Sequence, residues 1–340
     1  LESKGHLPVG FYPSFNDDED PKSGFSYGWP PPRFSNAYWA AHNRFGVLVE
    51  THSWKDYKTR VKAHFDVCAS LIRQASEDGD RWLKAARDAD ADDVKRSGDR
   101  VLLYRPGKES KPLDFLGYAY AIEKSSVSGK NWLRYDDSKP QVWHVPYFDD
   151  LQPSLSVTLP AGGYLVPAQH AAWVAEKLKA HGIRFTVLKK AVTAAPVQQF
   201  LVQPKFRPTP YEGHLTLEAQ GAWAPVAADV PVGSLFVPQH QPRNAMVSFL
   251  FEPSSPESLL AWGFFNAHLE QKEYMEDYVT EEVAREQLKD PKVKAAFDEA
   301  LKDEKFAKDP EARLRFFAMR HPSYDRAAFV YPVLKSDVGY

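Results

Sequence analysis

The sequence predicts an α/β protein in several parts, and three features of the chain carry that prediction. Residues 45–49, FGVLV, form a continuous apolar run, which is typical of a strand buried on both faces. Short alternating segments bounded by Pro and Gly fill residues 101–253 and predict a mostly β domain. Residues 254–340 are rich in helix formers and predict a helical C-terminal segment. The chain should therefore contain one α/β unit, one mostly β domain and one helical segment, in that order.

Residues 1–77 are expected to hold a loop region, one strand and one helix. Residues 1–40 are rich in Pro, Gly, Asp and aromatic residues, and the run WPPPR cannot be helical because each proline disfavours helical backbone in the residue before it. Ser53 is a suitable N-cap for a helix that follows the strand. One apolar helix face is then formed by Val61, Phe65, Cys68, Leu71 and Ile72. A strand followed by its covering helix is the edge of an α/β layer.

The rest of the chain divides into a linker, the β domain and the helical segment. Residues 78–100 carry many charged side chains and predict a helical surface linker. The strands expected in 101–253 are VLLYRP, FLGYAYAIEK, QVWHVPYF, SLSVTLP, QQFLVQPKF, HLTLEAQ, SLFVP and AMVSFLF. Gln169–Ala180 predicts a helix that ends at His181 and Gly182. Helices in EEVAREQLKD, PKVKAAFDEALKD and PEARLRFFAMR are each opened by an acid or by Pro in the first turn.

Composition excludes several classes of function. The 340 residues are 43% hydrophobic and 26% charged, enough for a substantial core in more than one domain. The 43 basic residues are balanced by 45 acidic ones, so no basic field favours nucleic acid as a partner. Cys68 is the single cysteine, which excludes an internal disulfide and a cysteine-based zinc site. No apolar stretch approaches the roughly 20 residues that span a bilayer, so no transmembrane segment is expected.

Glu50 follows the apolar run directly and is the best candidate for chemistry. A buried strand fixes the position of a carboxylate at its end, and apolar surroundings can raise its pKa toward the value that suits a general base. The same residue could instead accept a helix-capping hydrogen bond or be an ordinary surface carboxylate. Residue pattern alone leaves these alternatives open.

One residue of the loop region is a candidate for holding a substrate. Arg33 follows three prolines, and a rigidly held guanidinium can bind a carboxylate through two parallel hydrogen bonds. A structural salt bridge to the acidic run 17–20 is the alternative for Arg33. Tyr27 lies in the same loop region, where an aromatic residue often serves as a packing anchor. The tryptophans of the later regions could line a binding face or lie in the core, and we favour the core for Trp173 and Trp262, because both fall on helical apolar faces.

Two segments resemble a known family. Pro31–Val61, PPRFSNAYWAAHNRFGVLVETHSWKDYKTRV, resembles the last part of the catalytic domain of zinc metallocarboxypeptidases of the carboxypeptidase A-like family, in a bacterial branch with a long C-terminal extension. Phe251–Val279, FEPSSPESLLAWGFFNAHLEQKEYMEDYV, is similar to the segment after the last strands of that extension. A looser likeness runs in order over most of the chain. The resemblance implies that residues 1–77 are the C-terminal edge of a carboxypeptidase-like α/β/α domain, followed by a mostly β accessory domain and a helical tail.

The resemblance also implies a reaction and its participants. In the family, the glutamate that ends this strand activates the zinc-bound water for hydrolysis of the C-terminal peptide bond, and this role falls on Glu50. Tyr27 has a position similar to that of a mobile, substrate-contacting tyrosine. The expected partners are a peptide substrate and the N-terminal catalytic portion, joined covalently or supplied as a separate chain. The location stays undetermined from composition, while the resemblance favours an extracytoplasmic one, periplasmic or secreted.

The zinc ligands of the family are missing from this sequence. The His-x-x-Glu pair occurs nowhere in the chain, and the context of His6, GHLPVGFYPSF, resembles the loop after the third ligand. His52 and His64 have no metal-ligand spacing. Zinc is therefore expected in the complete enzyme with ligands outside this chain, and the chain alone should bind no zinc and be inactive. The competing hypothesis is a non-catalytic binding or assembly module that has lost the metal-binding half.

Overall fold

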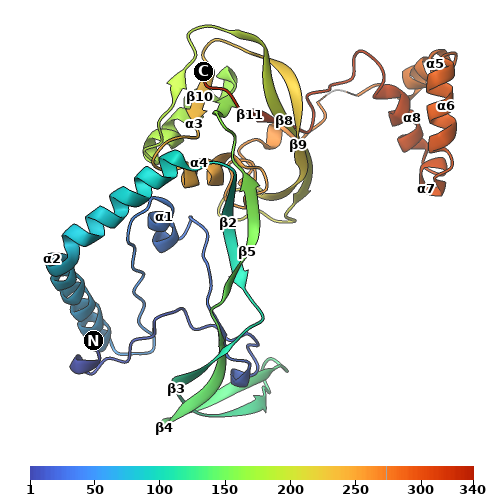
Figure 1. Cartoon of the computed structure of the whole chain (residues 1–340). Helices are drawn as coiled ribbons and strands as arrows, with labels where there is room; N and C mark the ends of the chain where they lie inside the picture. The colour runs from blue at the N-terminus through green and yellow to red at the C-terminus, as the bar shows by residue number, and fades with distance from the viewer. Residues whose placement is uncertain (273) are drawn as a thin grey trace.

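The computed structural model describes residues 1–272 and 274–340, and its central body is a six-stranded antiparallel sheet with strand order β7-β10-β6-β11-β8-β9 (Figure 1). The strands are β6 (Gly163–Val166), β7 (Thr186–Val187), β8 (Val192–Phe206), β9 (Leu217–Val230), β10 (Leu235–Pro238) and β11 (Val330–Ser336). Mixed α and β structure was predicted and is confirmed in that general form.

Two helices cover one face of this sheet. They are α3 (Ala168–Ala180) and α4 (Asn244–Phe251). Because side chains alternate along a strand, Tyr164 and Val166 of β6 pack in the core beneath these helices, while Leu165 packs in a smaller cluster on the opposite face. The prediction of α3 is confirmed, and Gly182 follows its C-cap with φ 62°, a value that glycine adopts without strain.

One predicted strand is a helix. The run AMVSFLF was expected to be β structure and instead forms α4, all eight residues of which are buried. A short segment that is apolar on every side has no periodicity that separates a buried strand from a buried helix. Burial on all sides, which only the tertiary structure supplies, decided for the helix.

A second β region extends from the body (Figure 1). It consists of β2 (Asp99–Pro106) paired with β5 (Leu151–Thr158), and of the hairpin β3 (Lys111–Lys124) with β4 (Asn131–Phe148), to which β1 (Phe25–Ser26) adds in parallel. An aromatic cluster stabilises the hairpin. Gly117 is needed there because a Cβ at its position would lie 2.4 Å from Trp143 Cε2. Three short 3₁₀ turns are η1 (Glu2–Lys4), η2 (Pro21–Ser23) and η3 (Asn266–His268).

The predicted helix after the apolar run is much longer than expected. Helix α2 (Tyr57–Lys95) has 39 residues and continues without a break through the expected boundary at residue 77 and most of the expected linker 78–100. It begins after Asp56 rather than Ser53, because the Asp56 carboxylate accepts a hydrogen bond of 2.9 Å from the Thr59 amide. Its C-terminal end contacts the body, where His240 Nδ1 lies 2.9 Å from the carbonyl oxygen of Val94. Figure 1 shows the rest of α2 reaching away from the sheet.

The predicted buried strand at residues 45–49 is not formed. This irregular segment lies between α1 (Ser35–Ala41) and α2, and the side chains of Phe45, Val47 and Leu48 are 65%, 61% and 50% exposed. A strand is stable only when a neighbour takes up its backbone hydrogen bonds. Among the described residues no strand lies alongside this segment, so it has nothing to pair with.

The C-terminal segment is helical as predicted but ends in a strand. The helices are α5 (Asp277–Gln287), α6 (Pro291–Ala300), α7 (Glu304–Ala307) and α8 (Pro310–Ala318), and they share a small core of Ala284, Phe297 and Phe317. Figure 1 shows them as a group beside the body. The chain then returns to insert β11 between β6 and β8, so residues 254–340 are not helical throughout.

Candidate functional site

Glu50, the predicted general base, lies on the surface in the irregular segment between α1 and α2. Its side chain is exposed, and no hydrogen bond or ion pair involves it in the part of the chain that the structure describes. The side chain of the nearby His52 accepts a hydrogen bond of 3.1 Å from the amide of Trp54 rather than contacting Glu50. The surroundings of Glu50 within this chain are therefore open to solvent.

Tyr27, the predicted substrate contact, lies in the aromatic cluster of the β3–β4 hairpin. Its amide donates a hydrogen bond of 2.9 Å to the carbonyl oxygen of Phe148, and its half-buried ring packs with Phe25, Trp143 and Tyr147. This is the location that the packing-anchor interpretation predicts. The structure does not bring Tyr27 and Glu50 together by any hydrogen bond among the described residues.

Arg33 lies at a cavity of the central body, away from the acidic run 17–20 with which a salt bridge was considered. Its Nη1 donates a hydrogen bond of 3.0 Å to Tyr211 Oη, and its Nε lies 3.5 Å from Glu257 Oε1. In the acidic run, Asp20 instead caps η2, and Glu19 accepts a hydrogen bond from Asn131. The proline-rich loop therefore places the Arg33 guanidinium beside Tyr211 and Glu257, a contact that the sequence did not predict.

The cavity at Arg33 has a volume of about 300 Å³ and a mixed lining of charged, aromatic and hydroxyl groups. Arg207, Tyr211, Glu218 and Trp262 contribute the side chains that reading the sequence missed. Trp262 was expected in the core on a helical face, but it lies in a turn after α4 and its Nε1 donates a hydrogen bond of 3.1 Å to Glu257 Oε2. Residues far apart in the chain meet here, so the sequence carried no local signal for the cavity.

Glu257 connects two walls of this cavity. Its carboxylate lies between the Arg33 guanidinium and the Trp262 indole, and its side chain is largely buried. Burial raises the pKa of Glu257, while the Trp262 hydrogen bond and the Arg33 charge partly offset that rise. The cavity is therefore a place where the protein holds charge in partly desolvated surroundings.

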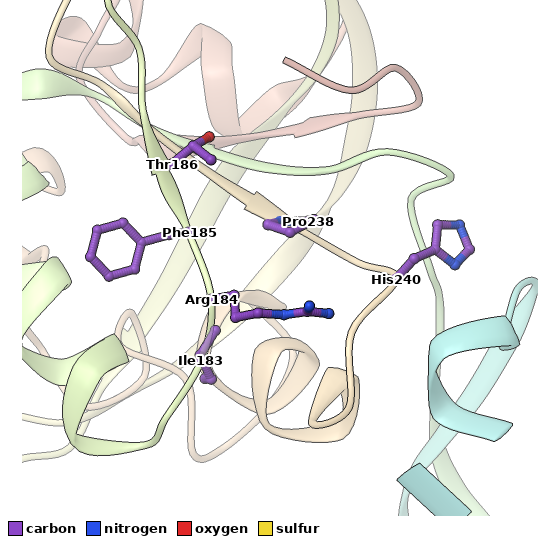
Figure 2. A pocket seen from close by; sticks show the side chains of 6 residues that line it. All are labelled: Ile183, Arg184, Phe185, Thr186, Pro238 and His240. Carbon is purple, nitrogen blue, oxygen red and sulfur yellow. The ribbon is translucent and has the colours of Figure 1, made fainter. Parts of the chain in front are cut away.

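A second hollow, with a volume of about 610 Å³, lies beside β7 at the edge of the sheet. Figure 2 shows the Arg184 side chain extending toward the segment that carries His240, while the His240 ring points away from Arg184 and Phe185 points to the other side. The Gln241 side chain accepts a hydrogen bond of 2.8 Å from the Arg184 amide, which fixes the backbone there. Only these two side chains bring charge or a titratable group to its lining, so it offers less specific chemistry than the first cavity.

A buried ionic cluster lies under α4 in the body. Lys335 Nζ lies 2.8 Å from Glu252 Oε1, Trp223 Nε1 donates a hydrogen bond of 3.1 Å to Glu252 Oε2, and Tyr164 donates to the same carboxylate. Burial, reinforced by the Glu252 charge, raises the pKa of Tyr164 and of Tyr331 well above the ordinary value. Lys335 and Glu252 are almost fully buried, so no substrate reaches them and the cluster is structural.

The described residues do not form a zinc site. No group of three or more His, Cys, Asp or Glu side chains in residues 1–272 and 274–340 is arranged to hold a metal ion. His6 lies 2.8 Å from Asp66, and His64 lies 3.4 Å from Thr51. His170 and His268 do meet, with their Nε2 atoms 2.8 Å apart, but they are only two. The described residues therefore do not fit the zinc that the family resemblance implies.

Comparisons with known proteins add nothing to the family resemblance of the two sequence segments. No protein-family model, curated protein or solved structure matches this chain. Among the described residues, no helix combines the length and apolar character needed to cross a bilayer.

Proposed function

We propose that this chain is the C-terminal portion of a zinc-dependent metallocarboxypeptidase and supplies the catalytic glutamate, Glu50. One observation carries the proposal: the segment that leads to Glu50 and the start of α2 leave apolar side chains 48% exposed or more, namely Phe45, Val47, Leu48, Val61, Phe65 and Ile72. Monomeric soluble proteins rarely leave large apolar patches uncovered, and such patches mark interaction sites.

The apolar segment lies alongside α2, although it forms no strand. The rings of Phe45 and Trp82 are 5.6 Å apart, and Arg44 forms two hydrogen bonds, of 3.0 and 2.8 Å, with the Asp90 carboxylate. The segment therefore runs along α2 while its remaining apolar side chains face solvent. Strands supplied by other sequence could pair with it and complete an α/β layer.

Val61, Phe65 and Ile72 of α2 are also exposed, although they form the helix face that was predicted to cover a sheet. An amphipathic helix normally buries such a stripe against another layer. The missing layer is the feature expected of an incomplete catalytic domain, and it supports the zinc ligands being located outside this chain.

In the complete enzyme, Glu50 would act as a general base toward the water that attacks the peptide carbonyl, and would then return the proton to the leaving amine. The substrate is a peptide cleaved at its C-terminal bond. Substrate contacts by Tyr27 and Arg33 belong to the same proposal, and they require that completion of the domain bring these residues to Glu50. The extracytoplasmic location follows from the resemblance alone.

The test begins with the coding sequence immediately upstream of Leu1. A His-x-x-Glu pair and a later histidine encoded there support the enzyme. The complete protein should then contain about one zinc per chain and the isolated chain almost none. Glu50→Gln in the complete protein should lower turnover on a C-terminal peptide substrate by roughly a hundredfold to ten-thousandfold, with little change in substrate binding.

Glu77→Gln is the matched control, because Glu77 is an exposed glutamate of α2 and its substitution should leave turnover unchanged. Peptide cleavage at near wild-type rate by Glu50→Gln would refute the role of Glu50.

The second candidate is a non-catalytic binding or assembly module. It is favoured by the location of Arg33, which is engaged by Tyr211 and Glu257 in a cavity of the body rather than paired with Glu50. An upstream sequence without the metal-binding motif, or a complete protein without zinc, would decide for this module.

A further inference from the structure

The cavity of about 300 Å³ beside Tyr211 is built from three segments that are distant in sequence. Arg33 comes from the proline-rich loop, Arg207 and Tyr211 from the connection between β8 and β9, and Trp262 from the turns after α4. Its volume is at the lower end of the range of about 300–1,000 Å³ that is usual for small-molecule sites. A compact ligand, comparable in size to an amino acid, is what such a space can hold.

Strand register gathers three polar side chains on one side of the β8–β9 hairpin. Lys205 pairs with Glu218 and Phe206 pairs with Leu217, so Arg207 lies opposite Thr216, and its amide donates a hydrogen bond of 3.0 Å to the Thr216 carbonyl oxygen. Alternating residues of a hairpin share a face. Arg207, Thr216 and Glu218 therefore belong to the same face, whereas Leu217 is buried in the core on the other.

The Tyr211 ring is held in place by a tight turn. Tyr211 and His214 exchange two backbone hydrogen bonds, of 2.8 and 2.9 Å, around Glu212 and Gly213, which have φ values of 47° and 79°. Two successive residues with positive φ form the kind of two-residue turn that matches the twist of a hairpin. Its ring then packs against both guanidinium groups, with Arg33 Cζ at 5.4 Å and Arg207 Cζ at 5.0 Å from the ring centre.

One cation and one anion of this lining are left without a strong partner. No carboxylate lies within ion-pair distance of Arg207 among the described residues. Glu218 has only Lys205 at 3.8 Å and a long hydrogen bond of 3.5 Å from Gln220. Arg33 and Glu257, by contrast, are engaged with each other and with Tyr211 and Trp262. The hydroxyl of Thr216 is buried and has no hydrogen-bond partner in the described part of the chain.

The rest of the lining is apolar and aromatic. The rings of Trp262 and Tyr211 have centres 6.1 Å apart at 46° to each other, and Pro253 and Pro256 add further apolar surface. The aliphatic or aromatic side chain of a ligand could pack between the Trp262 and Tyr211 rings.

We propose that this cavity binds a small zwitterion, an α-amino acid with an apolar side chain, either free or as the end of a dipeptide. Arg207 receives its carboxylate through the forked geometry of the guanidinium, Glu218 receives its ammonium group, and Trp262 packs on its side chain. A simple anion fits less well, because Glu218 and Glu257 balance the two arginines. The inference uses only residues of this chain and holds for either function proposed above.

The test is isothermal titration of the purified chain with four probes. L-phenylalanine carries both charges, N-acetyl-L-phenylalanine lacks the ammonium group, L-phenylalanine amide lacks the carboxylate, and glycyl-L-phenylalanine is the dipeptide. We expect saturable binding of L-phenylalanine or of the dipeptide, and about tenfold or greater loss of affinity for each analogue that lacks one charge. Whichever of L-phenylalanine and glycyl-L-phenylalanine binds more tightly shows whether the zwitterion is a free amino acid or a dipeptide.

Two variants assign the charges to residues. Arg207→Gln should weaken L-phenylalanine binding by about tenfold or more but leave binding of the amide unchanged, and Glu218→Gln should weaken L-phenylalanine but leave the N-acetyl compound unchanged. Lys139→Gln, at an exposed lysine of β4 outside the cavity lining, should bind all probes like the wild type. Circular dichroism of each variant verifies that it is folded.

Three results would overturn the inference: no saturable binding of L-phenylalanine or of the dipeptide, equal binding of the analogues that lack a charge, or wild-type affinity in folded Arg207→Gln. If Arg207→Gln does not fold, Arg207→Lys takes its place, since it keeps the charge and removes the forked hydrogen bonds. Glu50→Gln should bind every probe unchanged, so failure of the catalytic proposal is distinguishable from failure of this one.

Discussion

The six-stranded body and the unit formed by residues 43–95 contain similar apolar side chains, which are buried in the body and exposed in the unit. In the body, Leu165 is completely buried, whereas Leu48 in the other unit is 50% exposed. Both lie in short apolar runs, GYLV and FGVLV. The difference is that β6 lies between β10 and β11, while residues 45–49 have no neighbouring strand among the described residues.

This contrast shows that an apolar run in the sequence favours burial of a segment but does not ensure that the rest of the structure buries it. Backbone hydrogen bonds and a covering layer must come from elsewhere in the assembly. In the body, both the paired strands and the covering layer come from this chain, and β11 near the C-terminus is one of those strands. In the unit at 43–95, the described residues place α2 beside the apolar segment but no strand. We infer that its partner layer is supplied by sequence outside this chain, and four experiments can break or sharpen that comparison.

The largest effect is expected from the buried ion pair of the body. Lys335→Met leaves the Glu252 carboxylate buried without its counter-charge and should cost about 3–5 kcal/mol of unfolding free energy, measured by urea denaturation. Glu252→Gln in the same variant should restore part of that loss. Lys84→Met, which removes an exposed partner of Asp88 on α2, should cost less than about 0.5 kcal/mol. A similar cost for both lysines would contradict the assignment of a buried pair.

A matched pair of leucines tests the contrast directly. Leu165→Ala should destabilise the isolated chain by about 2–5 kcal/mol, because it leaves a cavity in packed surroundings. Leu48→Ala in the isolated chain should change stability by no more than about 0.5 kcal/mol, as for other exposed positions. In the complete protein, the cost of Leu48→Ala should rise above that value. An unchanged cost there would mean that nothing covers the segment.

A smaller effect is expected from acid on the contact between α3 and η3. Burial lowers the pKa of His170 and of His268 below the ordinary value of 6.5; the charge of His268 lowers the pKa of His170 further, and the charge of Lys272 lowers that of His268. The unfolded chain then binds more protons than the folded one just below pH 6.5, so stability should fall as the pH drops from about 7 toward the lowered pKa values.

Substitution at one histidine should reduce this dependence. The unfolding midpoint of His268→Gln should vary less between about pH 7 and pH 5 than that of the wild type, while His181, also buried, keeps part of the slope. Identical slopes for His268→Gln and the wild type would refute the contribution of this pair.

The smallest perturbation uses the single thiol as a reporter of covering. Cys68 is exposed on α2, so in the isolated native chain it should react with a thiol reagent as fast as in the unfolded chain. In the complete protein the same thiol should react at least about tenfold more slowly, if the missing layer packs on this helix face. Equal rates in the two proteins would argue against a layer over this face.

Local sequence signals were sufficient where a residue's neighbours are close in the chain. Caps and helix formers predicted α3, α5, α6 and α8, and alternation predicted the segments of β2, β3, β4, β5, β8 and β10. They failed for α4, whose uniformly apolar sequence fits a buried strand equally well. They also failed for β11, which lies in a segment expected to be helical.

The candidate sites divide in the same way. From the sequence alone, Glu50 stood out because an acid directly after an apolar run is visible locally, and Arg33 because three prolines fix its loop. That Arg33 meets Tyr211 and Glu257 could not be predicted, since these residues lie in segments that are joined only by packing of the body.

Helix caps, alternation and charge balance are properties of neighbouring residues, so the amino-acid sequence by itself determined most elements, the absence of a basic field and the candidate carboxylate. Burial and strand pairing are properties of the assembled chain, because the stabilising free energy comes from surface removed from water and from hydrogen bonds to distant segments. The tertiary structure therefore decided that α4 is a helix, that residues 45–49 are uncovered, and that Arg207, Glu218 and Trp262 share one cavity.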